Sequence, residues 1–227
     1  MKLRNILLTT LTAGALIGGS LQTNAQVTVD VNPGSTWLGW LNWTDIRANG
    51  WDGGSGWGVP DLTATFVGNP GTLTLGPNTI GDAADYWYIG GGGPGAQGAK
   101  IMEANLYVEE TGTLNGQTVT FEGTVLSDTF TSAHSTRVFV SDFAPDYSSR
   151  VDSFFDITGP GAFSVSLATI NDPGRHIQYG FQTRGENVWV TDVAPFGTVV
   201  IQTVPEPTTF ALVGLGAAVL LITRRRS

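Results

Sequence analysis

Five of the chain's seven tryptophans lie within 21 residues, interleaved with glycines: Trp37, Trp40, Trp43, Trp51 and Trp57. A flat indole ring in a Gly-rich loop can stack on the apolar face of a sugar, because it offers a large rigid surface at little entropic cost. We expect such a loop around Trp51 and Trp57, and these two rings, with Trp40, are the candidate carbohydrate-binding residues. The alternative is that the rings fill the core or cap one end of the fold, as most large aromatic side chains do.

A strand over residues 37–43 would sort the first three rings by face. Side chains alternate along a strand, so Trp37 and Trp43 would share one face with Leu41, and Trp40 would point the opposite way. Trp87 and Trp189 lie in strand-like patterns, and we expect them to pack against the core.

Aspartates occur in close pairs near turn-forming residues: Asp82 and Asp85, Asp142 and Asp146, Asp152 and Asp156. Calcium takes several oxygen ligands from loops, so a structural calcium ion is the one cofactor that these pairs could hold. The sequence contains no EF-hand or repeat-type calcium loop, and aspartate is a favoured turn residue in any protein. Solvated turn aspartates are therefore the preferred interpretation, and we predict no metal site and no other cofactor.

The sequence carries no catalytic signature. There is no G-x-S-x-G and no H-E-x-x-H, and the absence of cysteine excludes a thiol nucleophile and a Cys-ligated zinc. His134 and His176 are far apart in sequence, and both are interpreted as surface or structural residues. A glycosidase pair could be drawn from four glutamates, but any β-rich protein with this many carboxylates offers as much: Glu103, Glu109, Glu110 and Glu122. We predict that the protein is not an enzyme.

These side chains must be positioned by strands, because period-two alternation dominates the middle of the chain. Met102, Ala104, Leu106 and Val108, for example, fall on one face. We expect strands at 27–31, 61–66, 102–108, 118–126, 137–143, 151–158, 163–168, 176–183, 188–193 and 198–203. Turn signals separate them, and no stretch shows a strong period of 3.6. The pattern predicts an all-β fold: a single antiparallel β-sandwich, jelly-roll-like, over residues 26–203.

The N-terminus has the organisation of a secretory signal peptide. Lys2 and Arg4 form a positive region, an apolar run follows at residues 6–17, and Thr23-Asn24-Ala25 places small residues where a signal peptidase cleaves. The apolar run is too short for a membrane span. We therefore predict a signal peptide over residues 1–25, removed by signal peptidase after Ala25.

The C-terminus combines three features in a fixed order. Val204-Pro205-Glu206-Pro207 is followed by an apolar stretch at residues 210–222 and then by Arg224, Arg225 and Arg226. The apolar stretch predicts a short hydrophobic helix, and the arginines hold its end in the cytoplasm. The positive end of the signal peptide is cytoplasmic as well, so both ends place the intervening domain across the membrane.

This order of motif, hydrophobic helix and arginine cluster resembles the PEP-CTERM sorting signal of Gram-negative bacteria. The resemblance covers residues 204–227 and implies that an integral-membrane exosortase recognises Pro205, Glu206 and Pro207. It further implies that the helix holds the chain in the inner membrane until the tail is processed, after which the product reaches the cell surface or the extracellular polysaccharide matrix. The alternative is an ordinary single-span anchor.

The central domain is strongly acidic once both ends are set aside. Residues 26–203 hold eighteen acidic residues against six basic ones, a net charge of −12. Such a domain does not bind nucleic acid or anionic lipid through charge, whereas cations and neutral polymers are compatible partners. In outline the domain is similar to jelly-roll carbohydrate-binding modules. Two non-enzymatic functions remain: a module that binds extracellular polysaccharide, and a structural matrix or adhesion protein without a defined ligand.

Overall fold

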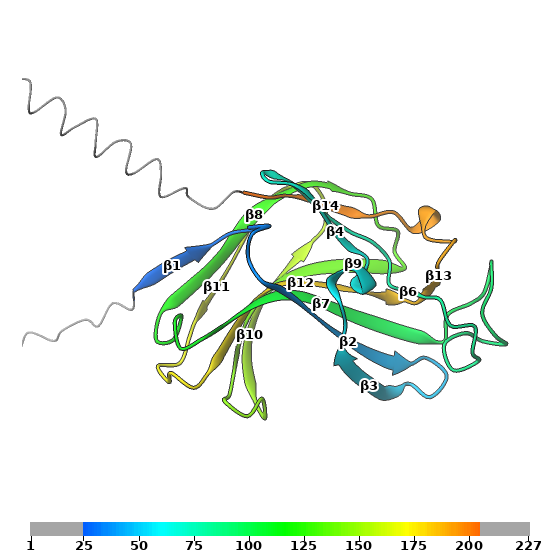
Figure 1. Ribbon diagram of the computed structural model, residues 1–227, viewed down its shortest axis with the longest axis horizontal. Helices are drawn as coiled ribbons and strands as arrows, with labels where there is room; N and C mark the ends of the chain where they lie inside the picture. Colours follow the sequence, from blue (N-terminus) through cyan, green and yellow to red (C-terminus); the bar gives the residue numbers. More distant parts are fainter. Residues whose placement is uncertain (1–24, 205–227) are drawn as a thin grey trace, which may run out of the picture.

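Fourteen β-strands make up most of residues 25–204, the part of the chain that the computed structural model describes (Figure 1). The front sheet has the order β10-β9-β12-β7-β2-β3, in which every neighbouring pair is antiparallel: β10 (Arg150–Ile157), β9 (His134–Phe143), β12 (His176–Glu186), β7 (Lys100–Thr111), β2 (Trp37–Asp45) and β3 (Gly50–Gly56).

The back sheet is organised around one strand, β8 (Thr118–Asp128). The others are β1 (Gln26–Val29), β4 (Ala64–Gly68), β5 (Gly71–Leu75), β11 (Gly161–Ala168) and β14 (Val199–Gln202). A separate small sheet pairs β6 (Thr79–Ile80) with β13 (Val188–Trp189). Two single-turn 3₁₀ helices complete the described chain: η1 (Val59–Leu62) and η2 (Ala194–Phe196).

The two large sheets pack face to face. In β7 the residues alternate between buried and partly exposed from Lys100 to Glu109, as a strand with one buried face must. Phe121 of the back sheet meets Tyr179 and Phe181 of the front sheet, with ring centroids 5.3 and 5.4 Å apart. Each such aromatic contact contributes about 0.5–1.5 kcal/mol beyond the area that it buries. The predicted all-β sandwich is therefore confirmed.

The expected glycine loop around Trp51 is wrong, because Gly50–Gly56 forms the edge strand β3 and pairs with β2. The glycines have a packing role in that strand. A Cβ at Gly53 would lie 2.4 Å from the Trp43 ring, and one at Gly54 would lie 2.6 Å from Asn42 Oδ1. Side chains of β2 thus lie across β3, which only glycine permits at such a close approach.

Other expected strands are displaced. The stretch 61–66 is not one strand, since its first two residues belong to η1 (Val59–Leu62) and Thr63 has a left-handed φ of 55° before β4 starts. The strand expected at 188–193 ends at Trp189. The sequence pattern also did not indicate β5, nor the parallel pairing of β1 with β8.

The two ends of the described chain meet in the back sheet. β1 and β14 both pair with β8, and the Val204 N–H donates to the Val31 carbonyl oxygen at 3.0 Å. Figure 1 shows the start of β1 and the end of β14 on the same side of the molecule. The ordered hydrogen bonding therefore continues to the residue that precedes Pro205.

The predicted signal peptide and C-terminal helix lie outside the described residues, and the boundaries at 25, 203 and 204 stay predictions. Among residues 25–204 the structure contains no helix of sufficient length and apolarity to cross a membrane.

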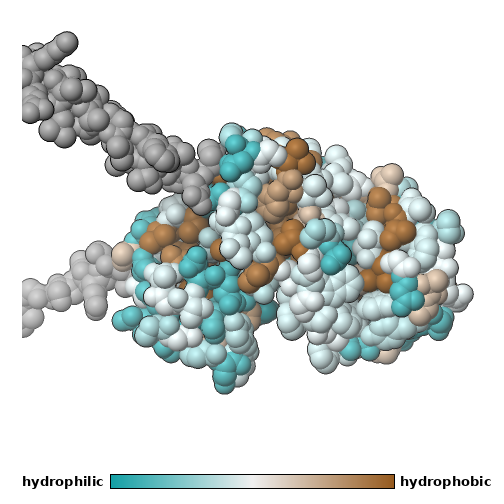
Figure 2. Space-filling view, viewed as in Figure 1, coloured by the Kyte–Doolittle hydropathy of each residue, from teal (hydrophilic) through white to brown (hydrophobic). Residues whose placement is uncertain are grey.

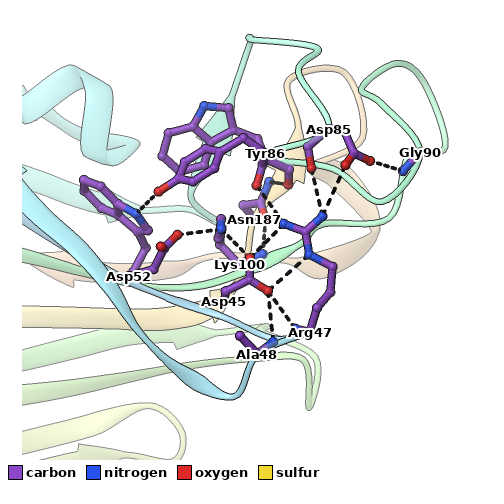
Figure 3. A network of polar contacts seen from close by, with 11 residues as sticks. Asp45, Arg47, Ala48, Asp52, Asp85, Tyr86, Gly90, Lys100 and Asn187 are labelled. Atoms are coloured by element: carbon purple, nitrogen blue, oxygen red, sulfur yellow. Dashed lines mark hydrogen bonds and ion pairs between the residues drawn. The ribbon is translucent and has the colours of Figure 1, made fainter.

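A buried lysine ties the β2–β3 hairpin to the rest of the front sheet (Figure 3). The Lys100 Nζ lies 2.6 Å from both Asp45 Oδ2 and Asp52 Oδ2, and 3.9 Å from the centre of the Tyr86 ring. Arg47 Nη2 also pairs with Asp45 Oδ2, at 2.7 Å. Two cations thus share one carboxylate, and the turn end of the hairpin is fastened to the start of β7.

The pKa values follow from these contacts. Burial by itself would lower the pKa of Lys100, but its hydrogen bonds to Asp45 and Asp52 outweigh burial and raise it. Arg47 and then Lys100 hold the pKa of Asp45 well below its usual range. Lys100, followed by Tyr86, lowers the pKa of Asp52. All the ion-paired groups therefore keep their charges at neutral pH.

We predict that Lys100→Met destabilises the domain by about 3 kcal/mol, because it leaves carboxylates without their buried partner. The stability contributed by Asp45 and Asp52 is complete above their unfolded pKa of about 3.9 and is lost as the pH falls through their lowered folded pKa. Urea denaturation between pH 7 and 2.5 should therefore show a shallower acid loss in the variant than in the wild type.

Arg184→Met is the matched control, since Arg184 pairs with Glu103 at 3.2 Å on the exposed surface. It should cost no more than about 0.5 kcal/mol. Equal destabilisation by the two variants would contradict a structural role for the buried lysine.

Candidate functional site

A groove with a volume of about 550 Å³ crosses the outer face of the front sheet. In Figure 2 a notch in the lower edge of the molecule separates the part formed by β10 from the part formed by β2 and β3. The lining residues come from five strands and the β9–β10 turn: Trp40, Asn42, Asn105, Tyr107, Glu109, Phe139, Ser141, Phe143, Tyr147, Arg150, Phe154, Gln178 and Gln182.

Strand register brings these side chains to one face. Tyr107 of β7 and Phe139 of β9 both pair with Gly180 of β12, so the two rings flank a position that has no side chain. A Cβ at Gly180 would lie 2.0 Å from the Leu106 carbonyl oxygen, so the close contact with β7 requires glycine there. The middle of the groove is therefore formed by two aromatic rings and bare backbone.

Amide side chains form the polar part of the floor. Gln182 Nε2 donates to Asn105 Oδ1 at 2.8 Å, and Asn105 Nδ2 donates to the Trp40 carbonyl oxygen at 3.1 Å. Gln178 Nε2 donates to Glu109 Oε2 at 2.7 Å. These bonds fix both glutamines, which are less than 10% exposed, with their carbonyl oxygens left as acceptors.

Those acceptors are free in the described part of the chain. Within residues 25–204, the side-chain carbonyl oxygens of Gln178 and Gln182 accept no protein hydrogen bond. The Tyr107 hydroxyl makes none either. Burial, and then the nearby Glu109, raises the pKa of Tyr107, so its hydroxyl stays protonated and can donate. The floor thus offers fixed acceptors and a donor, a pattern that suits a ligand carrying several hydroxyl groups.

One end of the groove is lined by Tyr147 and Glu109, and His176 packs against Tyr147. The Tyr147 hydroxyl donates to Glu109 Oε1 at 3.0 Å, and its ring stacks on His176 with centroids 4.3 Å apart and planes 9° apart. Burial, followed by Glu109, raises the pKa of Tyr147 to about 12. Tyr147 has a left-handed φ of 58°, an uncommon conformation for a bulky residue that costs about 1–3 kcal/mol and tends to occur at functional sites.

Aromatic rings form the two walls. Trp40 is 42% exposed, and its Nε1 donates to Asn42 Oδ1 at 2.8 Å, which fixes the plane of the indole. Phe154, on the opposite wall, is 38% exposed. Exposed rings held in fixed orientations are suitable for stacking against the apolar faces of a ligand.

Comparison with known proteins identifies one region of the chain. Residues 203–226 match the family model of the PEP-CTERM protein-sorting motif. The chain carries a PEP-CTERM sorting motif. The resemblance predicted from the sequence is confirmed, and the motif implies exosortase-dependent sorting to the cell surface. Its residues Pro205, Glu206, Pro207, Arg224, Arg225 and Arg226 lie outside the described part of the structure. No curated protein and no solved structure matches the chain.

The structure separates the three candidate tryptophans. Trp40 lines the groove, as described. Trp51 is 76% exposed and pairs with Thr44, which places it on the same sheet face but outside the groove lining. Trp57 is partly buried against the core and lines a different cleft, next to Trp87. The three rings therefore do not form one stacking surface.

The other tryptophans pack as expected. Trp37 and Trp43 lie on the inner face of β2 with Leu41, and Trp87 and Trp189 pack against the core. Sequence reasoning missed the glutamines, Tyr107 and Phe154 of the groove. Their signal was weak: it consists of amide and aromatic residues on the outward-facing positions of central strands, where charged residues or threonine are more common.

The aspartate pairs serve local structure. Asp142 is buried and binds Arg175 and the Ile170 N–H, while Asp82 and Asp146 accept backbone N–H groups within their own turns. Across residues 25–204, no three His, Cys, Asp or Glu side chains gather closely enough to hold a metal ion.

The candidate glycosidase carboxylates are also dispersed. Glu103 and Glu109 lie on the same face of β7, but six residues separate them, or about 20 Å along the strand. Glycosidase pairs are about 5–9.5 Å apart. Glu122 belongs to β8 of the back sheet.

We predict that Trp57→Ala lowers the free energy of unfolding by about 2 kcal/mol, because the ring packs against the core. Trp51→Ala should change it by less than about 0.5 kcal/mol, since the ring is largely in solvent. Thermal denaturation of the two single variants measures the difference. A similar loss in both would contradict the different burial of the two rings.

Proposed function

We propose that this protein is a non-enzymatic surface protein that associates with extracellular polysaccharide through the groove on its front sheet. The signal peptide over residues 1–25 would export it from a Gram-negative cytoplasm after cleavage by signal peptidase. The C-terminal helix would hold it in the inner membrane until exosortase processes the tail and the domain reaches the surface or matrix. The observation that carries the proposal is the groove, with its two aromatic walls and its floor of fixed amides.

The groove chemistry supports a carbohydrate over other neutral ligands. Sugars present hydroxyl groups around their rim and apolar C–H faces above and below the ring. The Trp40 and Phe154 rings match the faces, and the carbonyl oxygens of Gln178 and Gln182 match the hydroxyls. Because these groups are already fixed by hydrogen bonds and packing, binding orders few side chains and costs little entropy.

The position of the chain ends supports a surface role. β1 and β14 belong to the back sheet, whereas the groove lies on the outer face of the front sheet. A domain held through Val204 would therefore present the groove on the sheet that does not carry the attachment point. The wide separation of Glu103 from Glu109 and the absence of catalytic sequence motifs support the non-enzymatic part of the proposal.

The first test concerns the tail. We expect the mature surface form to end near Pro207, because exosortase substrates lose the hydrophobic helix and the arginines. Mass spectrometry of surface and membrane fractions would identify the C-terminal peptide. A surface fraction dominated by peptides that still contain Arg224 would replace processing with a permanent single-span anchor.

The second test concerns the groove. Trp40→Ala should weaken binding to polysaccharide purified from the producing bacterium's own matrix by about five- to tenfold, since it removes one stacking wall. Trp51→Ala is the control, because its ring is even more exposed to solvent than that of Trp40 but lies outside the groove. Affinity electrophoresis of both variants and the wild type would measure the effect.

Two results would count against the proposal. Equal retention of Trp40→Ala and the wild type would exclude the groove as the binding site. No retention of the folded wild type would favour the alternative, a structural matrix or adhesion protein without a defined ligand.

A further inference from the structure

Arg137 differs from every other basic residue of the described chain. Although acidic residues outnumber basic ones eighteen to six in residues 26–203, the remaining five cations each lie within 4.0 Å of a carboxylate: Arg47, Lys100, Arg150, Arg175 and Arg184. Among residues 25–204, Arg137 alone has no such partner. Its side chain also makes no hydrogen bond to the described chain, and its Nε is buried without an acceptor.

The guanidinium group lies beside the groove. Arg137 is the cross-strand neighbour of Gln182, which belongs to the floor, and its guanidinium carbon lies 3.8 Å from the centre of the Phe154 ring, which forms a wall. Asp156 is its neighbour on β10, yet the two form no ion pair. The stacking on Phe154 orients the guanidinium plane and leaves its Nη nitrogens accessible at the rim.

We propose that Arg137 binds a carboxylate carried by the polysaccharide chain in the groove, so that the ligand is a polymer of mostly neutral sugars with isolated acidic residues. This inference rests on the proposed polysaccharide-binding function. A planar guanidinium group with free N–H donors matches the two oxygens of a carboxylate and can bind them in bidentate geometry. Leaving such a group without a partner in a protein rich in carboxylates costs stability, which a ligand contact would offset.

The charge of the domain limits how acidic the ligand can be. A net charge of −12 repels a dense polyanion over about 8 Å at physiological ionic strength, and Arg137 beside the groove is the one unpaired cation among residues 25–204. Arg150, the arginine within the groove lining, is already paired with Asp152 at 2.8 Å. The glutamine carbonyls of the floor accept hydroxyl groups and repel carboxylates. A single acidic sugar in a neutral repeat fits these constraints, and a polyuronate does not.

The test compares native matrix polysaccharide with the same material after chemical reduction of its carboxyl groups to alcohols. Titration calorimetry should show that the wild type binds the reduced polymer about tenfold more weakly than the native one, as expected for loss of a charged hydrogen-bonded pair. Arg137→Met, which keeps an apolar side chain against Phe154, should bind the native polymer about tenfold more weakly and show no further loss on the reduced polymer. Arg137→Lys should fall between the two.

Arg184→Met is the control, because Arg184 is on the same sheet face but paired with Glu103, and it should behave as the wild type. Thermal denaturation verifies that each variant is folded. Polygalacturonate should bind more weakly than the native polymer.

The outcomes separate the two proposals. Equal binding of both polymers by the wild type, or unchanged binding by Arg137→Met, would overturn the assignment of Arg137 and leave the groove as a neutral sugar site. Tighter binding of polygalacturonate would overturn the limit on ligand charge. No binding of either polymer by the folded wild type would overturn the polysaccharide function itself, and this inference with it.

Discussion

The register between β7 and β12 determines both the core and the groove. The two strands pair over eleven residues, from His176 opposite Thr111 to Glu186 opposite Ile101. On the inner face this register brings Phe181 against Phe121 of the other sheet, and on the outer face it places Gln178 and Gln182 beside Glu109 and Asn105. A slip of one residue would exchange the faces and bury the amides. The core thus fixes the position of the groove, and the aromatic packing that stabilises the sandwich also orients the groups that would meet a ligand.

Glycine makes this arrangement possible at two sites. At Gly180 the approach of the Leu106 carbonyl leaves no room for a Cβ, and the gap lets the rings of Tyr107 and Phe139 form the middle of the groove. At Gly53 the Trp43 indole lies across the edge strand, so the wall that carries Trp40 is backed by a packed ring. The buried ion pairs of Lys100 fasten the turn end of that same hairpin. Glycine and a buried lysine each weaken an isolated strand. Here neighbouring atoms occupy the space that a Cβ would take at the two glycines, and two carboxylates pair with the lysine.

Sequence reasoning recovered the sandwich because alternation over residues such as Met102 to Val108 depends only on which face is buried. It failed at β3, because a stretch of seven residues with four glycines is typical of a loop. The reason for a glycine there is the Trp43 ring of the neighbouring strand, which the sequence pattern does not show. The face of Trp40 was predictable from alternation, whereas its partners were not. Gln178 and Gln182 reach the groove through long-range pairing with β7 and β9, and Tyr147 reaches it through a strained turn; neither leaves a local pattern. The sorting motif was recognisable because its residues are contiguous in sequence.

The chain end that leads into the sorting motif and the proposed binding groove lie on opposite sheets of the same domain. Hydrogen bonds from Val204 to Val31 and from Gly71 to Thr203 hold the chain in the back sheet up to the residue before Pro205. An anchored or processed terminus therefore leaves from a rigid point, and the orientation of the front sheet relative to that point is set by the fold.

The charge distribution follows the same division. Five of the six cations neutralise particular carboxylates within the fold, and the sixth, Arg137, stands at the rim of the groove. A strongly acidic surface keeps dense polyanions away at long range, while one unpaired guanidinium group can act only on a ligand that has already reached the groove.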